Sequence, residues 1–497
     1  MKTPRTTTWA PLVWLVLFLS LGTAFQAQAA TPPDSLDLFL QAKMRQLRIP
    51  GLQLAVVRHG KIIRTGQYGL ANVQDSVLVT GQTRFTINSI TKAFVGVAVM
   101  QLVEAGKLDL TAPASRYLDG LPTAWQPVTV RQLLTHTSGL PDIMPDDEMV
   151  TEENESAAWA KVQTQPMDFA PGEKFAYNQT NYLLLGKIID KLSGQPFIEF
   201  IQERQLKVVG MPRTTFGDAH DVLPHGARGY TYYHNSNGQM RRGNQLRNTF
   251  ETFPPMLRTA AGMSSTAEEV ARWIIALQQC QLLRPASLST LWTPGTLNNG
   301  TQRGFSRMLN GYALGWPTVT RSEHRAVAPV GGGRSALFIY PDDDLAIVVL
   351  TNLIGANPDV FMDEIAGHYL PDMRAVAGFG LPPTIRALHT ELRKRGFAQA
   401  SALVNQEKKK NAAYQLPEDE VNAWGYMLLR QNMAREAVEV FKLNVSLYPQ
   451  SANTYDSLAE TYADLGNQEL ATKNYKRALA LNPKNAAAAA YLKKLQN

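Results

Sequence analysis

The sequence predicts an α+β domain with an antiparallel sheet and a helical subdomain, followed by an all-helical domain. Strand-like blocks lie at both ends of residues 50–350, with helix-like stretches between them. From about residue 384 the pattern changes to helices alone and repeats every 34 residues. A chain of 497 residues has room for two or three such domains.

The first 29 residues have the pattern of an export signal. Lys2 and Arg5 precede an apolar run over residues 12–25, and the small-x-small pattern of a cleavage site follows at residues 27–29. The alternative is a membrane anchor, but a span needs about 20 apolar residues and this run is shorter. We therefore expect cleavage near Ala29, no stable membrane span afterwards, and a periplasmic or secreted bacterial protein.

Local patterns predict the first strands and the first long helix. Residues 52–57 form a largely apolar strand, residues 59–61 a turn, and residues 62–64 the start of a second strand. The apolar stretch 93–105 is too long for a typical strand and predicts a buried helix that stops at Gly106.

A second strand block closes this domain. Residues 335–350 contain two apolar runs with a turn at 340–344, whereas residues 141–174 are polar and acidic, as in a surface excursion. Strands at both ends with helices between them indicate a sheet to which both ends of the domain contribute.

The helical tail contains a repeat. Three pairs of packing positions share a spacing of 34 residues: Ala437 and Ala471, Phe441 and Tyr475, and Pro449 and Pro483. This pattern resembles a tetratricopeptide repeat, so residues 384–497 are predicted to form such a domain after a linker at 371–383. Residues 384–417 are expected to be an atypical leading hairpin. Such repeats bind a protein partner in a concave groove or make the chain self-associate.

Composition excludes several functions. The net charge of +7 is spread over the whole chain without a basic tail, so nucleic acid is not an expected partner. The single cysteine, Cys280, rules out an internal disulfide and is expected to be buried and inert. No metal or nucleotide motif is present, so neither a metal nor another cofactor is expected.

One motif carries the chemistry. Ser89 and Lys92 form the Ser-x-x-Lys sequence directly before the apolar helix. Residues i and i+3 share a helix face, so the lysine amine can reach the serine hydroxyl. The helix N-terminus favours a developing alkoxide, and a lysine deprotonated by burial can serve as its base.

The surroundings of this motif resemble the serine beta-lactamase-related family. They comprise the segments 49–51 (IPG), 100–110 (MQLVEAGKLDL), 130–141 (VRQLLTHTSGLP), 258–266 (RTAAGMSST) and 313–316 (ALGW). The family includes class C beta-lactamases, D-Ala-D-Ala carboxypeptidases, D-aminopeptidases and esterases. The resemblance implies a beta-lactamase/transpeptidase-like domain over residues 30–370.

The resemblance also implies roles for individual residues. Ser89 matches the acylated nucleophile of the family and Lys92 the lysine that activates it. Tyr177 matches the tyrosine of the second motif, which carries a proton to the leaving group. Gln179 stands where the family has asparagine, and its amide can still hold Lys92 or a substrate carbonyl. His136 lies in a segment that is a structural turn in the family.

The third motif departs from the family. The matching segment, 329–335 (PVGGGRS), has Pro329 or Val330 in place of the usual lysine or histidine. Gly332 and Gly333 allow a substrate backbone to approach the strand.

The end of this segment leaves two questions open. Arg334 is either a replacement cation for substrate binding or a surface charge. A backbone N–H near Ser335 is expected to pair with that of Ser89 as an oxyanion hole. Without the usual cation, recognition of a substrate carboxylate is in doubt, which weakens the beta-lactamase and D-Ala-D-Ala carboxypeptidase hypotheses.

Two functions follow. The first is an exported serine hydrolase that cleaves a small-molecule or peptide ester or amide, such as a peptidoglycan-derived or D-amino-acid peptide, through an acyl-enzyme on Ser89. The alternative is a degenerate scaffold whose repeats bind a protein partner.

Overall fold

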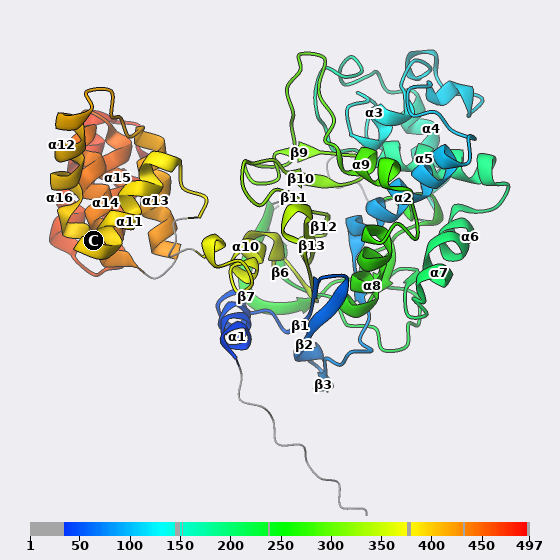
Figure 1. Ribbon diagram of the computed structural model, residues 1–497, viewed down its shortest axis with the longest axis horizontal. Coiled ribbons are helices and arrows are strands. Elements are labelled where there is room, and N and C mark those ends of the chain that lie inside the picture. Colours follow the sequence, from blue (N-terminus) through cyan, green and yellow to red (C-terminus); the bar gives the residue numbers. More distant parts are fainter. Residues whose placement is uncertain are drawn as a thin grey trace, which may run out of the picture.

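The computed structural model describes residues 34–144, 150–151, 153–236, 239–374, 379–430 and 433–494. The expected signal, residues 1–29, lies outside these ranges. Figure 1 shows a large domain built around a sheet and, beside it, a unit made only of helices. Within the described ranges, no helix is long and apolar enough to cross a membrane.

Both ends of the large domain contribute to its main sheet, as predicted. The N-terminal strand β1 (Gly51–Arg58) lies between β2 (Lys61–Asn72) and the late strand β14 (Leu345–Thr351), antiparallel to both. Beyond β14 comes β13 (Ser335–Tyr340), with β12 (Val330–Gly331) paired to it. The sheet is completed by β3 (Val77–Leu78), β9 (Gly311–Tyr312), β10 (Pro317–Val319) and β11 (Ala326–Val327).

Alternate residues of each strand face opposite layers. Leu54 and Val56 of β1 pack on one face with the helices α1 (Ser35–Leu47) and α10 (Met362–Ala366). Ala55 faces the helical subdomain on the other side. The helices that pack on this side include α2 (Thr91–Glu104), α5 (Gln179–Ser193) and α8 (Ala267–Gln278).

Helix α2 is the buried helix that the apolar stretch predicts. Almost its whole length is buried, which explains why the sequence shows no polar face. At Gly96 a Cβ atom would lie 2.2 Å from the backbone oxygen of Leu314, so the neighbouring chain crosses α2 in direct backbone contact. This packing fixes the position of the helix N-terminus, where Ser89 and Lys92 lie.

The helical unit repeats more regularly than its sequence indicates. Helices α12, α14 and α16 begin at residues 400, 434 and 468, and α13, α15 and α17 begin at residues 418, 452 and 486, each at intervals of 34 residues. The full bounds are α11 (Pro383–Arg395), α12 (Ala400–Lys410), α13 (Glu418–Arg430), α14 (Ala434–Leu447), α15 (Ala452–Asp464), α16 (Gln468–Leu481) and α17 (Ala486–Lys494). The expected leading hairpin, α11 and α12, thus follows the same spacing in its second helix. That the unit is a tetratricopeptide-repeat domain stays a prediction.

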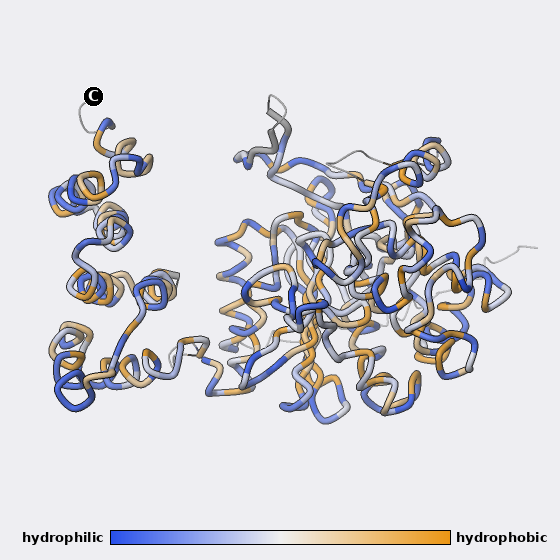
Figure 2. The backbone as a smooth tube through the Cα atoms, turned by 90° about the horizontal axis from the view of Figure 1, so that it is seen from above, coloured by the Kyte–Doolittle hydropathy of each residue, from blue (hydrophilic) through white to orange (hydrophobic). Residues whose placement is uncertain are grey.

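The buried side of the helical unit contains the residues that the repeat predicts. Ala437, Phe441, Ala471 and Tyr475 all belong to one hydrophobic cluster. In Figure 2 the helices of this unit carry both hydrophobic and hydrophilic stretches, and the unit stands clear of the larger domain.

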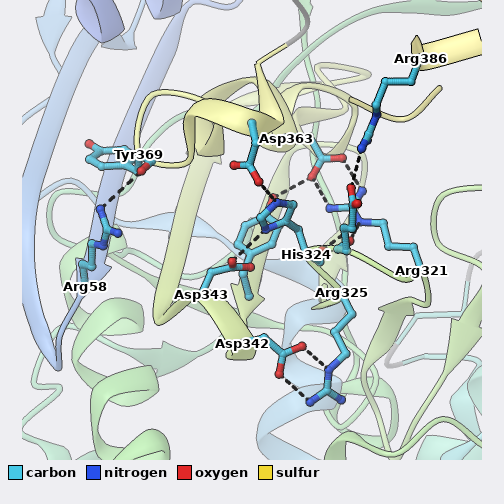
Figure 3. A network of polar contacts seen from close by, with 12 residues as sticks. Arg58, Arg321, His324, Arg325, Asp342, Asp343, Asp363, Tyr369 and Arg386 are labelled. Atoms are coloured by element: carbon cyan, nitrogen blue, oxygen red, sulfur yellow. Dashed lines mark hydrogen bonds and ion pairs between the residues drawn. The ribbon is translucent and has the colours of Figure 1, made fainter. Parts of the chain in front are cut away.

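A polar network lies where the large domain leads into the helical unit (Figure 3). His324 lies between two carboxylates, with Nδ1 2.8 Å from Asp343 Oδ1 and Nε2 2.9 Å from Asp372 Oδ2. Arg386 of α11 donates to Glu323 of the large domain at 2.8 Å. The network therefore joins the two parts of the chain by charge.

Two expectations need correction. Cys280 is half-buried just after α8 rather than fully buried, because the helix ends there with a left-handed residue. The segment 141–174 is more than a surface excursion: it contains α4 (Glu155–Gln163), and Ile143 and Val162 belong to the main core.

Candidate active site

Ser89 lies at the N-terminal entrance of α2. It belongs to the short 3-10 turn η1 (Asn88–Ile90), which leads directly into the helix. The preceding residue, Asn88, has a φ of +46°, a left-handed conformation that is uncommon outside glycine. Ser89 is half-buried, so its hydroxyl sits at the boundary between the core and the solvent-facing site.

Lys92 lies one helical turn further along, with no exposed surface. Its Nζ is 3.5 Å from Ser89 Oγ, and it donates to Gln179 Oε1 at 2.9 Å and to the backbone oxygen of Ala260 at 2.7 Å. Burial lowers the pKa of Lys92 to about 7, against the opposing effect of the nearby Asp142 carboxylate.

The partners of Lys92 suit a neutral amine. A neutral amine has two N–H donors and one lone pair. In the charged form, Lys92 donates to Ser89 Oγ as well; in the neutral form, Gln179 and Ala260 can accept its two donors, and the lone pair is then available to the Ser89 hydroxyl. With a pKa near 7, a large share of the molecules holds this form at neutral pH, so Lys92 is able to accept the serine proton.

Tyr177 completes the group around Ser89. Burial raises the pKa of its phenol, while a hydrogen bond with the Ser89 side chain opposes that shift. Lys92 Nζ lies 4.7 Å from the centre of the Tyr177 ring. Tyr177 therefore stays protonated at neutral pH, and its hydroxyl can pass a proton on but does not act as a phenolate base.

Gln179 is the first residue of α5. Its side chain reaches Lys92, and its backbone N–H donates to Asp142 Oδ1 at 3.1 Å. The helix is capped by Asn178, whose side chain accepts from the N–H of Asn181. The glutamine thus stands where the resemblance expects an asparagine and still makes a contact with the lysine.

The glycine turn of the third motif, residues 331–333, lies against the nucleophile turn η1, which carries Ser89. A Cβ on Gly331 would lie 2.0 Å from the Ile87 oxygen and 3.1 Å from the Ser89 nitrogen, and one on Gly332 would lie 2.7 Å from Asn88 Cγ. Gly332 and Gly333 have φ values of +55° and +60°, which turn the chain back into β13. Only glycine permits both this approach and this turn.

Arg334 is not a surface charge, and its buried position beside a carboxylate does not suit a free cation for the substrate. Its side chain is only 3% exposed, so it is not a surface charge. Its Nη2 lies 3.1 Å from Glu251 Oε2, so its charge is already paired inside the protein. Burial lowers the pKa of the guanidinium, and the Glu251 carboxylate opposes this.

Ser335 is buried in β13. Its hydroxyl donates to the Thr86 oxygen at 3.1 Å, and its partner across the ladder is Gly331. The residue that adjoins the Ser89 N–H is therefore Gly331, at the start of the turn, rather than Ser335. The second backbone N–H of the expected oxyanion hole therefore belongs to residues 331–333.

His136 is held inside the domain next to this group. It has no exposed surface, and its Nδ1 accepts from the Asn178 backbone N–H at 3.1 Å. Burial, reinforced by the Lys92 charge, lowers its pKa well below the ordinary value. His136 is thus neutral and supports the loop that carries Tyr177, as a structural turn requires.

Sequence reasoning missed four contributors: Asp142, the Ala260 carbonyl, Asn88 and Glu251. Asp142 directly follows the segment 130–141, and Ala260 lies within the segment 258–266. The resemblance therefore points to both places in the chain, but not to the contacts that these two residues make with Lys92. Nothing in the local pattern marks Glu251. No group of three or more His, Cys, Asp or Glu side chains suited to a metal occurs in the ranges that the structure describes.

The geometry brings together a hydroxyl at a helix N-terminus, a buried lysine with a lowered pKa, a protonated tyrosine and a glycine turn, which is a set of groups suited to a serine nucleophile. The chain belongs to the beta-lactamase family, because the family model described as Beta-lactamase matches residues 36–369.

Named proteins are similar in sequence to this chain. The chain is 27% identical over 328 residues to Protein flp of Staphylococcus aureus (strain MW2), covering 64% of this chain and 63% of that protein. It is 27% identical over 306 residues to penicillin-binding protein 4* of Bacillus subtilis (strain 168), covering 59% of this chain and 66% of that protein. The chain therefore spans less than two thirds of the length of either relative.

Solved structures share the fold. A penicillin-binding protein homologue from Pyrococcus abyssi, described as octameric, matches with a TM-score of 0.57 and 25% identity, covering 68% of this chain and 77% of that one. The D-amino acid amidase of Ochrobactrum anthropi SV3 matches with a TM-score of 0.56 and 22% identity, covering 68% and 98%. The second likeness concerns the fold alone.

Proposed function

We propose that this protein is an exported serine hydrolase that cleaves an ester or amide through an acyl-enzyme on Ser89. The observation that carries the proposal is the placement of Lys92. Its Nζ is held by the Gln179 side chain and the Ala260 oxygen at 3.5 Å from Ser89 Oγ, so that in the neutral form its lone pair can be directed at the serine. Burial lowers the pKa of this amine to about 7, which makes the neutral form available as a base at the distance where the serine needs one.

The first half of the reaction forms the acyl-enzyme. Ser89 Oγ attacks the carbonyl carbon while its proton moves to Lys92 Nζ. The negative charge that develops on the carbonyl oxygen is held by the Ser89 N–H and by a donor from the turn at 331–333. When the tetrahedral species collapses, Tyr177 gives its proton to the leaving alcohol or amine and regains one from Lys92.

The second half restores the enzyme. Water attacks the acyl carbon while one of its protons moves to Lys92 Nζ, and that proton then passes to the serine oxygen, which leaves as the hydroxyl. No step needs a redox partner or a further reactant.

The charges around the site disfavour a substrate that carries a carboxylate beside the scissile bond. Val330 stands at the start of the third motif, and the Arg334 guanidinium is paired with Glu251. A substrate carboxylate beside the scissile bond would find no free cation on this strand. We therefore favour esters and amides that have no carboxylate beside the scissile bond, including D-amino-acid amides or peptides, over beta-lactams and free D-Ala-D-Ala termini.

The test combines labelling with turnover. A fluorophosphonate probe is expected to label the mature protein but not Ser89→Ala, with the adduct found by mass spectrometry on the peptide that contains Ser89. A panel of p-nitrophenyl esters, D-amino-acid amides and nitrocefin then ranks the substrates. The absence of any adduct on folded protein, or equal labelling of Ser89→Ala, would rule the mechanism out.

A binding scaffold is the second candidate. Gln179 and Val330 depart from the family motifs, and the helical unit offers a surface for a protein partner or a second copy of the chain. Equal hydrolysis by wild type and Ser89→Ala across the panel would favour this function. Sizing the chain with and without residues 384–497 tests whether the repeats mediate self-association.

Export belongs to the same proposal. The basic start, the apolar run and the small-x-small pattern support cleavage near Ala29. N-terminal sequencing of protein recovered from the periplasm or medium should begin at about residue 30. An intact N-terminus in the membrane fraction would instead support an anchor.

A further inference from the structure

Three side chains join the two sides of the expected oxyanion-binding site. Asn88 precedes the nucleophile, Arg334 follows the glycine turn, and Glu251 lies between them. Asn88 Nδ2 donates to Glu251 Oε1 at 3.1 Å, and Glu251 Oε2 lies 3.1 Å from Arg334 Nη2. We propose that these three residues form a clamp that sets the distance between the Ser89 N–H and the glycine turn; the inference rests on the proposed hydrolase function.

The Arg334 end of the clamp is fixed from two directions. Its backbone oxygen accepts from both the N–H and the hydroxyl of Thr351 at 2.9 Å, which ties it to β14. Its N–H donates to the Gly331 oxygen at 3.0 Å and closes the glycine turn. The position of the turn is therefore coupled to the position of the Arg334 side chain.

The charges of the clamp depend on each other. The Arg334 side chain is almost fully buried, and the Glu251 carboxylate lies against it. Removing Glu251 would leave the buried guanidinium without its counter-charge, whereas the Glu251 side chain is 23% exposed and would remain partly solvated without Arg334. Arg334 Nη2 makes no hydrogen bond to the residues that the structure describes, so its charge attracts the Glu251 carboxylate as an ion pair, and the carboxylate in turn accepts from Asn88.

The Asn88 end sits directly under the glycine turn. Its left-handed backbone places the side chain where a Cβ on Gly332 would lie 2.7 Å away. A non-glycine residue in this conformation persists only when its surroundings hold it. The hydrogen bond to Glu251 is one such restraint, and a shift of Asn88 would move the adjoining Ser89 N–H.

The experiment compares clamp variants with a matched control. The clamp variants are Glu251→Gln, Arg334→Met and the double variant; the control is Asp363→Asn, which removes the carboxylate that pairs with Arg321 at 2.8 Å elsewhere in the domain. Each protein is measured for kcat and KM on the best p-nitrophenyl ester and for affinity to a phenylboronic acid, which mimics the tetrahedral species. Thermal unfolding gives the folded fraction, and hydrogen exchange reports on residues 87–92.

A positioning role predicts a specific pattern. Each clamp variant is expected to lose about tenfold or more in kcat and in boronate affinity, with KM within about twofold, because a displaced donor is felt most in the transition state. The double variant should lose no more kcat or boronate affinity than the more impaired of the two single variants, because each substitution already disrupts the same clamp. Arg334→Lys should keep part of the activity, and Asp363→Asn should lose stability alone.

Two results would overturn the clamp. One is unchanged kcat and boronate affinity in folded clamp variants; the other is a loss that only follows the folded fraction, as in Asp363→Asn. A wild type with neither turnover nor labelling defeats the hydrolase proposal instead. In that case hydrogen exchange decides: faster exchange at residues 87–92 in the clamp variants alone supports the clamp, and unchanged exchange overturns it.

Discussion

Lys92 shows how one residue acquires its chemistry from its surroundings. Full burial removes water from the amine and disfavours its charged form, while Asp142 pulls the pKa in the opposite direction. Gln179 and Ala260 supply neutral acceptors, which support the amine without adding a counter-charge. The balance of these contacts places the titration of Lys92 in the physiological range.

This balance predicts the pH dependence of activity. Lys92 must be deprotonated to accept the serine proton, so kcat/KM is expected to rise with pH through an apparent pKa of about 7. The measurement is a pH–rate profile on an ester whose leaving group does not itself titrate between pH 5 and 9. A profile that is flat over this range would show that Lys92 is not the base.

Two isosteric variants should shift that profile in opposite directions. Gln179→Glu places a carboxylate at the position now 2.9 Å from Nζ, raises the Lys92 pKa and lowers activity at pH 7 by about tenfold, with recovery at pH 9. Asp142→Asn removes the group that raises the Lys92 pKa, so the acidic limb moves to lower pH. Shifts in the same direction would contradict this account of the site.

At the level of elements, the site depends on how closely α2 is packed. The helix is buried on nearly all sides, and at Gly96 it meets backbone rather than a flexible side chain. Backbone cannot move aside as a side-chain tip can, so this contact fixes the depth of the helix in the domain. The nucleophile turn and the glycine turn meet by the same kind of contact.

Gly96→Ala tests this packing. An added Cβ would lie 2.2 Å from the Leu314 oxygen, so we expect a loss of about 1–3 kcal/mol in the free energy of unfolding. Urea unfolding of the full chain measures it. Gly81→Ala is the control, since its nearest neighbour would be 4.0 Å away at the end of a glutamine side chain. Equal stability of both variants would show that the domain relaxes around Gly96.

At the scale of the whole molecule, the polar network of Figure 3 links the sheet domain to the segment that leads into the helical unit. His324 is held between Asp343 and Asp372, and Arg386 reaches across to Glu323. Burial alone would lower the pKa of His324, but the hydrogen bonds to the two carboxylates outweigh it and raise the pKa.

The raised pKa predicts how stability varies with pH. A histidine whose folded pKa is raised stabilises the fold fully below its ordinary pKa of about 6.5, and this contribution is lost as pH rises through the raised value. His324→Asn should therefore lower the free energy of unfolding by about 1 kcal/mol at pH 6 and by less at pH 9. The difference between wild type and variant is the quantity to measure, because Lys92, with its lowered pKa, makes stability rise with pH above about 7 in both proteins. A difference that does not change with pH would contradict the role of the two carboxylates.

Short-range patterns were sufficient for much of this protein. Ser89 and Lys92 are three residues apart on one helix, so their contact follows from helical geometry. The hairpin, the buried helix and the two late strands follow from hydrophobic runs and turns, and the resemblance brings Tyr177 into the same group. The period of 34 residues predicted the helix pairs of the tail, because each pair packs in the same way against its neighbour.

The tertiary structure alone decided the partners that lie far apart in the chain. Glu251 meets Asn88 across 163 residues, and the Ala260 oxygen meets Lys92 across 168. Arg334 was read from sequence as a free cation or a surface charge, yet folding buries it against Glu251. The sequence by itself determined the order of the elements, which follows from local periodicity, and it predicted the candidate nucleophile and its lysine from the Ser-x-x-Lys motif and the family resemblance. Which charges are paired, and which groups set the pKa of the lysine, depended on the folding of distant segments into one core, because an electrostatic interaction is fixed by distance and burial rather than by separation along the chain.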